Sequence, residues 1–390
     1  MDFRFSKEDE EFRQEVRDFI AKEWLPIGAD GGGESVFSTA IWPKVQVLRK
    51  KLAALNWIAI SWPKEYGGLG ASLVKQAIFK EEMAYWRCPG IDPQAYQFGP
   101  AVIMHGTEEQ KKKYLGGIAR SEVVWCQGFS EPDAGSDLAS LQTRAVQDGD
   151  DFIINGQKIW TSGAHLADYI HMLARTDPDA PKHRGISYFI FPMTLPGITV
   201  KPIAQMTGGE GFNEVYFDNV RIPKDSLFGE LNRGWYVATT TLDFERSNVA
   251  GAAGAQRSLE DLVKFCKATK HNGGRLIDDP QVRYRLANTA IEVAVGRNLS
   301  YRVLWMQDQG MVPNMEASIA KMFSVDVSAT LAGRSIEIMG LFGQLGEGSR
   351  WSPMKGGPMR GYLATACKVG GGSQEIMKNI IAQRGLGLPR

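Results

Sequence analysis

The central part of the chain differs in texture from the parts on either side of it, and this contrast limits the possible folds more than any other feature. From about Ser121 the sequence has short runs rich in Val, Ile, Phe and Tyr that are separated by turn residues, which is typical of strands. Before this part, and again from about Gly234, apolar residues recur at the spacings of helices with one buried face. The sequence therefore predicts an α+β fold with a helical domain at 1–121, a β domain at 122–231 and a second helical domain at 232–390.

Individual elements follow from the same patterns. Ser6 can cap a first helix whose apolar face ends at Trp24. Further helices are expected within 41–57, 73–86, 108–118, 235–270, 279–309 and 315–340, with a last one after Ser373. Strands are expected at 151–154, 157–160, 168–174, 186–191, 198–203 and 214–217. Asn155-Gly156 predicts a type I′ hairpin turn between the first two strands, because both residues accept positive backbone angles.

Charge and cysteine usage narrow the class of protein. The 45 basic residues nearly balance the 44 acidic ones, so no overall field attracts nucleic acid or an acidic membrane. The chain begins with a charged segment rather than an apolar one, and no run approaches the roughly 20 apolar residues of a membrane helix. The four cysteines are far apart and form no CxxC pair. We therefore expect a cytoplasmic protein with reduced thiols and with neither a membrane nor a nucleic acid as partner.

Several common kinds of site are not indicated. The sequence has neither a GxGxxG dinucleotide fingerprint after a strand nor a GxxxxGK[ST] phosphate loop. It also lacks a GxSxG nucleophile motif, and its five histidines never occur at metal-ligand spacing. We expect no metal site, and the glycine-rich segments need another explanation.

Three segments stand out when taken together. They are Gly128 to Asp137, with the sequence GFSEPDAGSD, Lys158 to Gly163, with the sequence KIWTSG, and Val369 to Gln374, with the sequence VGGGSQ. Glycines and small hydroxyl residues in the first segment expose N–H and O–H donors, which suit a pyrophosphate or the polar edge of a flavin. Trp160 in the second segment offers a flat apolar face, although a tryptophan in a strand is more often part of a core. Only the joint order of the segments favours a functional interpretation.

In that order, the three segments resemble the acyl-CoA dehydrogenase family, and the resemblance covers essentially the whole chain. It implies a helical N-terminal domain, a β-barrel-like middle domain, a C-terminal four-helix bundle and FAD as cofactor. It also implies that Ser136 lies near the thioester-bearing arm of CoA. The residues it implies as flavin contacts are Gln127, Phe129, Ser130, Trp160, Thr161, Ser162, Gly371, Gly372, Ser373 and Gln374.

The catalytic base is where the chain departs from the best-known family pattern. Many members carry a glutamate just before the last helix, at the position where this chain has Gly370. A minority branch places the base on the first helix of the C-terminal domain in a Leu-x-x-Glu-Arg run, which is similar to Leu242 to Arg246 here. The resemblance therefore implies Glu245 as the base, Arg246 beside the substrate and the Gly370 N–H as a donor to the thioester oxygen. The alternative is that Glu245 and Arg246 form an ordinary ion pair on a helix surface.

The resemblance also implies an activity and its partners. The activity is α,β-dehydrogenation of an acyl-CoA, with electrons passed to an electron-transfer flavoprotein. The glycines at 370–372 leave space near the thioester, and the end of the chain at 376–390 resembles bacterial enzymes for bulky acyl-CoAs; both favour a branched or cyclic acyl group. Alternatives are a non-oxidative flavoprotein such as a desulfinase, an oxidase, which the chain length disfavours, and a non-catalytic sister subunit, which Glu245 disfavours.

A final expectation concerns assembly. In homotetrameric relatives, an Arg-x-x-Phe pair and a Gln-x-x-Gly-Gly run from the neighbouring chain hold the adenosine half of FAD. The matching positions here, Lys270 to Gly273 and Glu337 to Leu341, are degraded, and Glu337 would repel a pyrophosphate. We therefore expect a heterotetramer with a sister dehydrogenase subunit, with an identical-chain oligomer as the alternative.

Overall fold

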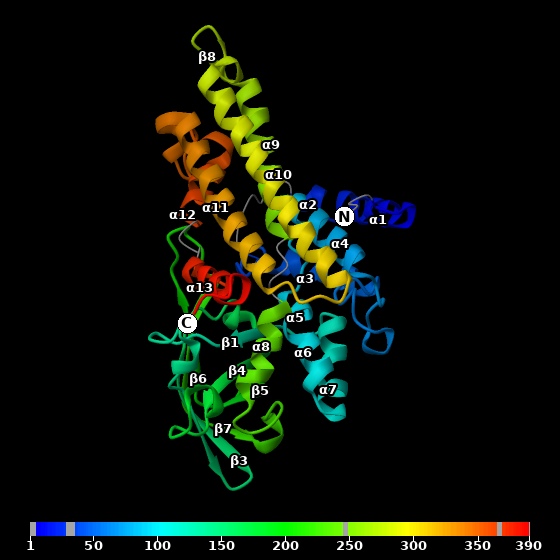
Figure 1. The fold of residues 1–390 in the computed structure, drawn as a ribbon, viewed down its shortest axis with the longest axis vertical. Helices are drawn as coiled ribbons and strands as arrows, with labels where there is room; N and C mark the ends of the chain where they lie inside the picture. The colour runs from blue at the N-terminus through cyan, green and yellow to red at the C-terminus, as the bar shows by residue number, and fades with distance from the viewer. Residues whose placement is uncertain (1–4, 29–35, 245–248, 365–368, 390) are drawn as a thin grey trace. The chain divides into compact units, whose positions relative to one another are not determined.

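A computed structural model of the chain describes residues 5–28, 36–244, 249–364 and 369–389 (Figure 1). By their contacts the residues form two compact units. The helical unit takes its residues from Met1–Gly33, Ala71–Ile91 and Arg246–Arg390. The mixed unit takes its residues from Glu34–Gly70 and Asp92–Glu245, and it contains all the strands of the central part of the chain.

The mixed unit is built on one curled sheet. Its strands are β1 (Trp125–Gly128), β2 (Arg144–Asp148), β3 (Asp151–Lys158), β4 (Tyr169–Arg175), β5 (Ile186–Pro192), β6 (Ile198–Ile203) and β7 (Phe212–Pro223). They lie in the order β1-β4-β2-β3-β7-β6, and β5 pairs with β4. β4 runs parallel to β1 and β2, and the other pairs are antiparallel. The strands predicted at 168–174, 186–191 and 198–203 are confirmed, and the one at 214–217 is the centre of the longer β7.

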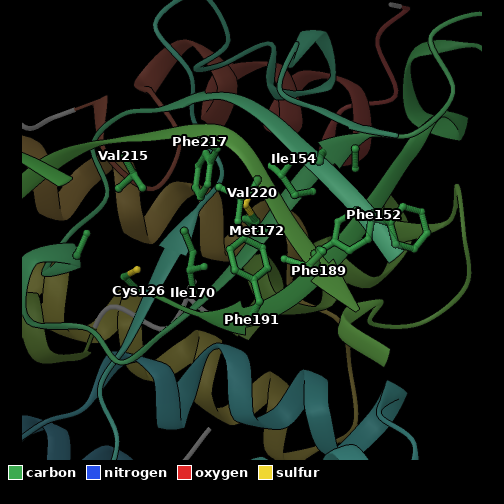
Figure 2. Packing of buried hydrophobic residues seen from close by; sticks show 14 residues of the cluster. Cys126, Phe152, Ile154, Ile170, Met172, Phe189, Phe191, Val215, Phe217 and Val220 are labelled. Atoms are coloured by element: carbon green, nitrogen blue, oxygen red, sulfur yellow. The ribbon is translucent and has the colours of Figure 1, made fainter. Parts of the chain in front are cut away.

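Alternation of apolar side chains explains how this sheet buries one face. On β7, Val215 and Phe217 point inward and, beyond an irregular pair, so do Val220 and Ile222. Figure 2 shows Val215, Phe217 and Val220 packed with apolar residues from other strands of the sheet. These residues include Phe152, Ile154, Ile170, Met172, Phe189 and Phe191. Each large side chain buried in this way contributes roughly 1.5–3 kcal/mol. The sheet is therefore a rigid support for the loops that follow its strands.

The predicted hairpin turn at Asn155-Gly156 is wrong. Strand β3 continues through both residues, and its pairing with β7 shifts register between Ile154 and Gly156, as at a β-bulge. The tight turn lies earlier, where Asp148 pairs with Asp151 and Gly149 has a φ of +64°. Gly156 is needed for close approach, because a Cβ there would lie 2.6 Å from the Thr143 hydroxyl. An Asn-Gly pair thus marks a bulge here, for which the same backbone freedom is required.

The helices of the mixed unit are α3 (Trp42–Ala54), α5 (Pro93–Tyr96), α6 (Phe98–His105), α7 (Glu108–Ala119) and α8 (Gly234–Phe244). α7 begins with a capping box between Thr107 and Gln110, and its predicted range is confirmed. α6 packs against α5, α7 and α8, and α8 packs against β5. The sequence analysis did not predict α5 and α6, because α6 is apolar on nearly all sides and has no helical stripe.

The helical unit contains α1 (Lys7–Glu23), α2 (Leu25–Gly28), α4 (Leu73–Tyr85), α9 (Val249–Ala268), α10 (Pro280–Asp308), α11 (Asn314–Met339), α12 (Gly357–Ala364) and α13 (Gln374–Ile380). A short hairpin of β8 (Lys270–His271) and β9 (Gly274–Arg275) follows α9. Helices α9, α10 and α11 pack together around a shared apolar core, and α4 packs on α9 and α1 (Figure 1). Ser6, Asp279 and Ser373 cap α1, α10 and α13. Within the described ranges, no helix is long and apolar enough to cross a membrane.

A buried charge network joins three helices of this unit. Arg13 of α1 donates to Glu81 and Glu82 of α4, at 2.7 Å in each case. Arg297 and Tyr301 of α10 donate to the two oxygens of Glu81, at 3.0 Å and 2.8 Å. Burial alone would raise the pKa of Glu81, but its partners Arg13 and Arg297 hold it below its ordinary value. The carboxylate is therefore ionised at neutral pH and fixes how these helices pack.

Candidate functional site

The two motif segments of the mixed unit lie side by side. Phe129 and Ser130 follow strand β1, and Ile159 to Ser162 follow strand β3. The Ile159 N–H donates to the Ser130 carbonyl at 2.9 Å, which joins the two segments directly. Gln127 lies on β1 opposite His171 of β4. The structure thus brings together the flavin contacts predicted in this unit.

Trp160 has an unusual backbone and an exposed side chain. Its φ of +58° lies in the left-handed region, which a bulky residue seldom adopts. The residue is 56 % exposed, and the ring of Phe212 lies edge-on to its indole at a centroid distance of 6.0 Å. Strained residues are retained where the local geometry has a use. An exposed flat ring held in this way suits contact with a flat aromatic ligand.

Thr161 has the opposite character, because it is completely buried. Its N–H donates to the Asn213 carbonyl and its own carbonyl accepts from the Asn213 amide, both at 3.0 Å. Among the residues that the structure describes, its hydroxyl has no hydrogen-bond partner. A buried polar group without a partner costs about 1–3 kcal/mol, so the hydroxyl fits a polar atom supplied by a bound molecule. Trp160 and Thr161 together fit a cofactor with an aromatic face and a hydrogen-bonding edge.

Ser136 lies in an exposed loop that is joined to a basic turn. Its neighbour Asp137 accepts from Lys182 at 2.7 Å, and Lys182 also donates to Ser140 at 3.0 Å. Lys182 to Arg184 form one exposed turn between β4 and β5, with three basic residues in succession. The sequence analysis missed this turn, although the Lys-His-Arg run was visible. The pairing brings positive charge close to the predicted CoA-binding serine.

The glycine segment of the helical unit is held by a lysine that the sequence analysis did not single out. Lys321 of α11 donates to the carbonyls of Gly370, at 2.5 Å, and Gly372. Because the peptide group is planar and trans, the N–H that follows each of these carbonyls points away from Lys321. Gly371 and Gly372 have φ values of +64° and +99°, which favour glycine. Lys321 therefore orients the backbone donors of this segment.

The end of the segment is anchored as well. Ser373 caps α13 by accepting from the Ile376 N–H at 3.3 Å. The Gln374 amide donates to Asp326 of α11 at 2.6 Å. In this unit Gly370 to Gln374 thus form one ordered strip against α11. Glu245 and Arg246 lie outside the described residues, in the sequence between the end of α8 and the start of α9.

A groove of about 760 Å³ in the helical unit contains the positions expected to face a neighbouring chain. It is lined in part by Lys270, His271, Glu337 and the exposed ring of Trp351. Glu337 pairs with Arg285 at 2.8 Å, so the repulsion predicted from its charge is partly offset.

The one fully buried histidine among the described residues is a core residue. His171 is buried between Tyr188 and Gln94, which bind its two ring nitrogens at 2.7 Å and 2.8 Å. Burial lowers the pKa of His171 to about 3, so it is a neutral core residue. Across the described ranges, no group of three or more His, Cys, Asp or Glu side chains is placed to hold a metal ion.

In the mixed unit, the loop that contains Ser130 lies beside the exposed Trp160 and beside the Thr161 hydroxyl, which has no partner among the described residues. These features fit the class of proteins that hold a flat cofactor with a polar edge. Comparison with known families narrows this class. Residues 6–122 match the acyl-CoA dehydrogenase N-terminal domain, residues 126–220 the middle domain and residues 232–386 the C-terminal domain. The chain belongs to the acyl-CoA dehydrogenase family, whose members are flavoproteins, and it is an oxidoreductase. The resemblance and the fold class predicted from the sequence are confirmed.

Individual relatives cover the whole chain. Acyl-CoA dehydrogenase IpdE1 of Mycobacterium tuberculosis is 36% identical over 98% of both chains. The solved ChsE4-ChsE5 complex from Mycobacterium tuberculosis is 33% identical to this chain with a TM-score of 0.91, and 100% of each chain is covered. The solved Tcur3481-Tcur3483 steroid ACAD is 34% identical with a TM-score of 0.87, again over 100% of both chains.

Proposed function

We propose that this chain is an FAD-dependent acyl-CoA dehydrogenase that introduces a trans-2 double bond into a bulky acyl thioester. The observation that supports flavin binding best is the buried Thr161 hydroxyl next to the exposed Trp160, since no described residue offers this hydroxyl a hydrogen bond. Gln127, Phe129, Ser130 and Ser162 belong to the same two adjoining segments. FAD, when bound, supplies the acceptor for the hydride that leaves the β-carbon. The protein's own residues hold the cofactor, place the thioester and remove the α-proton.

Glu245 is the proposed base. The α-proton is acidic only while the thioester oxygen is held by hydrogen-bond donors, and we assign one of these to the Gly370 N–H. Gly370 has no side chain, so a carboxylate from elsewhere must take the proton, and the Leu-x-x-Glu-Arg run offers Glu245. Arg246 would lie beside the substrate. Lys321 binds the carbonyls of Gly370 and Gly372, and this order in the segment that carries the Gly370 N–H supports the role proposed for it.

The acyl group is proposed to be branched, cyclic or otherwise bulky. Without side chains at 370–372, the segment leaves room near the thioester. The solved structure described as a steroid ACAD, over its full length similar to this chain, supports a bulky substrate. At the other end of the substrate, Ser136 and the basic turn at Lys182 would meet the phosphate-bearing part of CoA.

A sister dehydrogenase subunit is the proposed partner, and an electron-transfer flavoprotein is the proposed acceptor. The Arg285–Glu337 pair leaves the groove of the helical unit poorly suited to hold a pyrophosphate by itself. Similarity to the ChsE4-ChsE5 complex supports an assembly of unlike chains. Light scattering and flavin content of the chain expressed alone test this idea. A stable homo-oligomer with full FAD would contradict it and favour an assembly of identical chains.

Anaerobic flavin bleaching tests the activity and its base together. The chain, in the assembly in which it binds flavin, is mixed with straight, branched and cyclic acyl-CoAs, and Glu245→Gln is compared with wild type. We expect the wild type to bleach with bulky thioesters and the variant to bind FAD and thioester without bleaching. Bleaching of both would place the base elsewhere. No bleaching with any thioester would favour a desulfinase-like reaction or a non-catalytic subunit.

A further inference from the structure

A fully buried lysine lies between the two motif segments of the mixed unit. Lys158, the last residue of strand β3, has no exposed side-chain surface. Its ammonium donates to the Glu131 carboxylate at 2.7 Å and to the Phe129 carbonyl at 3.1 Å. One side chain of β3 thus binds both the side chain and the backbone of the loop that follows β1.

Glu131 extends this connection to the far end of the same loop. Its carboxylate also accepts from the backbone N–H groups of Gln142, at 2.5 Å, and Thr143, at 2.9 Å, just before strand β2 begins. A reciprocal backbone pair between Glu131 and Ala134, at 3.1 Å each way, closes a tight turn inside the loop. The carboxylate therefore joins the start of the loop, its end and the end of β3.

The pair is a costly way to connect these segments. Burial lowers the pKa of Lys158 to about 8, and the charge of Glu131 opposes this shift. Burial would raise the pKa of Glu131, but Lys158 and the backbone donors hold it below its ordinary value. Both groups are therefore charged at neutral pH. A buried ion pair is often no more stabilising than apolar residues of similar volume, so its retention calls for a role in specific positioning.

The residues next to the pair indicate what it positions. Phe129 and Ser130 precede Glu131 directly, and Trp160 and Thr161 lie two and three residues after Lys158. The Ile159 N–H donates to Ser130 between these two sets. The Lys158–Glu131 pair thus lies directly beside the Ile159–Ser130 hydrogen bond, and the two connections together set the spacing between the Phe129 segment and the Trp160 segment.

We infer that the Lys158–Glu131 ion pair is a positioning device that holds these two segments at the spacing the flavin requires. The inference rests on the proposed flavin site, and neither residue is assigned contact with the cofactor. Phe129 and Ser130 belong to one of the two segments and Trp160 and Thr161 to the other, so a shift between the segments would misplace the donors proposed for the flavin. A displacement of even 1 Å weakens such a site, because its hydrogen bonds depend steeply on geometry.

The test separates positioning from folding. Lys158→Met and Glu131→Gln each break the pair, and Lys158→Met/Glu131→Gln removes both charges while the amide oxygen still accepts from the Gln142 and Thr143 N–H groups. All are made in the full-length chain, in the assembly that the wild type forms. The measurements are the melting temperature of the apoprotein, the FAD dissociation constant from titration of the apoprotein, and the visible spectrum of the bound flavin. Arg221→Met is the matched control, since Arg221 forms exposed ion pairs with Asp148 and Asp151 on the same sheet.

We expect the single variants to melt earlier and to bind FAD at least tenfold more weakly. The double variant should regain most of the melting temperature, because no unpaired charge remains buried, and should still bind FAD at least tenfold more weakly with an altered flavin spectrum. Arg221→Met should match wild type in FAD affinity. If the folded double variant, or a folded Glu131→Gln, binds FAD with wild-type affinity and spectrum, the inference is overturned. If the wild type itself binds no FAD, the proposed function fails instead.

Discussion

The roles of Thr161 and Lys321 can be inferred only from the residues that surround them in the folded chain. Thr161 is completely buried and, within the described part of the chain, its hydroxyl has no partner. Lys321 directs its ammonium at the carbonyls of Gly370 and Gly372. Resemblance in sequence identified the first as a flavin contact and gave no reason to single out the second. For Thr161, the hydrogen bond missing among the described residues suggests contact with a bound molecule. For Lys321, the two hydrogen bonds to glycine carbonyls suggest a positioning role.

Replacing Thr161 by valine should separate stability from binding. Valine has nearly the same shape and removes the unpartnered hydroxyl, so the free energy of unfolding of the apoprotein should stay equal or rise by about 1 kcal/mol. FAD affinity should fall, because a hydrogen bond to the cofactor is lost. Thermal melting and flavin titration measure the two effects. Thr143→Val is the matched control, since its hydroxyl donates to the Gln157 carbonyl at 3.2 Å and its loss should destabilise the apoprotein. A less stable Thr161→Val apoprotein would contradict the assignment.

Replacing Lys321 by methionine should slow the reaction without releasing the flavin. A hydrogen bond from a charged group contributes about 1.5–3 kcal/mol, so losing two should leave the glycine segment poorly ordered and lower kcat roughly tenfold or more. KM should change less, because the substrate keeps its other contacts. Lys321→Arg should recover part of the rate, and the exposed Lys267 of α9 provides the control Lys267→Met. Unchanged kcat in folded Lys321→Met would remove the positioning role.

At the scale of elements, apolar periodicity predicted the long helices, and runs rich in Val, Ile, Phe and Tyr predicted the strands. The long helices α10 and α11 and strands β4, β5 and β6 lie where their patterns placed them. The pattern was uninformative for α6, which is apolar on nearly all sides, and misleading at Asn155-Gly156, where a bulge and a hairpin turn need the same residues. The ion pair between Asp137 of the Ser136 loop and Lys182 joins residues that are far apart in the sequence, so no local sequence pattern could predict it.

The basic turn at Lys182 to Arg184 should affect only substrates with the phosphate groups of CoA. Arg184→Gln should raise KM for an acyl-CoA about two- to fivefold, because a solvent-exposed charge contact is worth up to about 1 kcal/mol. The effect should shrink at high salt, where exposed charges are screened. Steady-state kinetics with the matching acyl-pantetheine, which lacks these phosphates, should show no difference between variant and wild type. Lys224→Gln, another exposed basic residue of the mixed unit, serves as control. An equal loss with both thioesters would argue against a phosphate contact.

At the scale of the whole molecule, the two units are stabilised by different interactions. The mixed unit relies on an apolar layer against its curled sheet. The helical unit adds to its apolar core the buried charges around Glu81, which join α1, α4 and α10 although these helices are far apart in sequence. Sequence periodicity predicted the long helices of this unit but not the short α2 and α12, and the pairing of Arg13 with Glu81 needs the folded chain.

This network predicts how stability depends on acidity. The pKa of Glu81 is lower in the folded chain than its ordinary value of 4.5, so the unfolded chain binds the proton more readily. The stabilisation is therefore fully present above about pH 4.5 and is lost as pH falls further, through the folded pKa. Glu81→Gln should lower the free energy of unfolding at pH 7 by about 1.5–3 kcal/mol, because Arg13 keeps Glu82 as its partner while the charged hydrogen bonds to Glu81 are weakened. The stability of this variant should also fall less steeply than that of wild type below pH 4.5.

Urea denaturation from pH 7 downward measures both effects of Glu81→Gln. Glu11→Gln, which removes only an exposed pair with Lys7, should follow the wild-type curve. Parallel acid curves for wild type and Glu81→Gln would mean that other carboxylates govern acid unfolding.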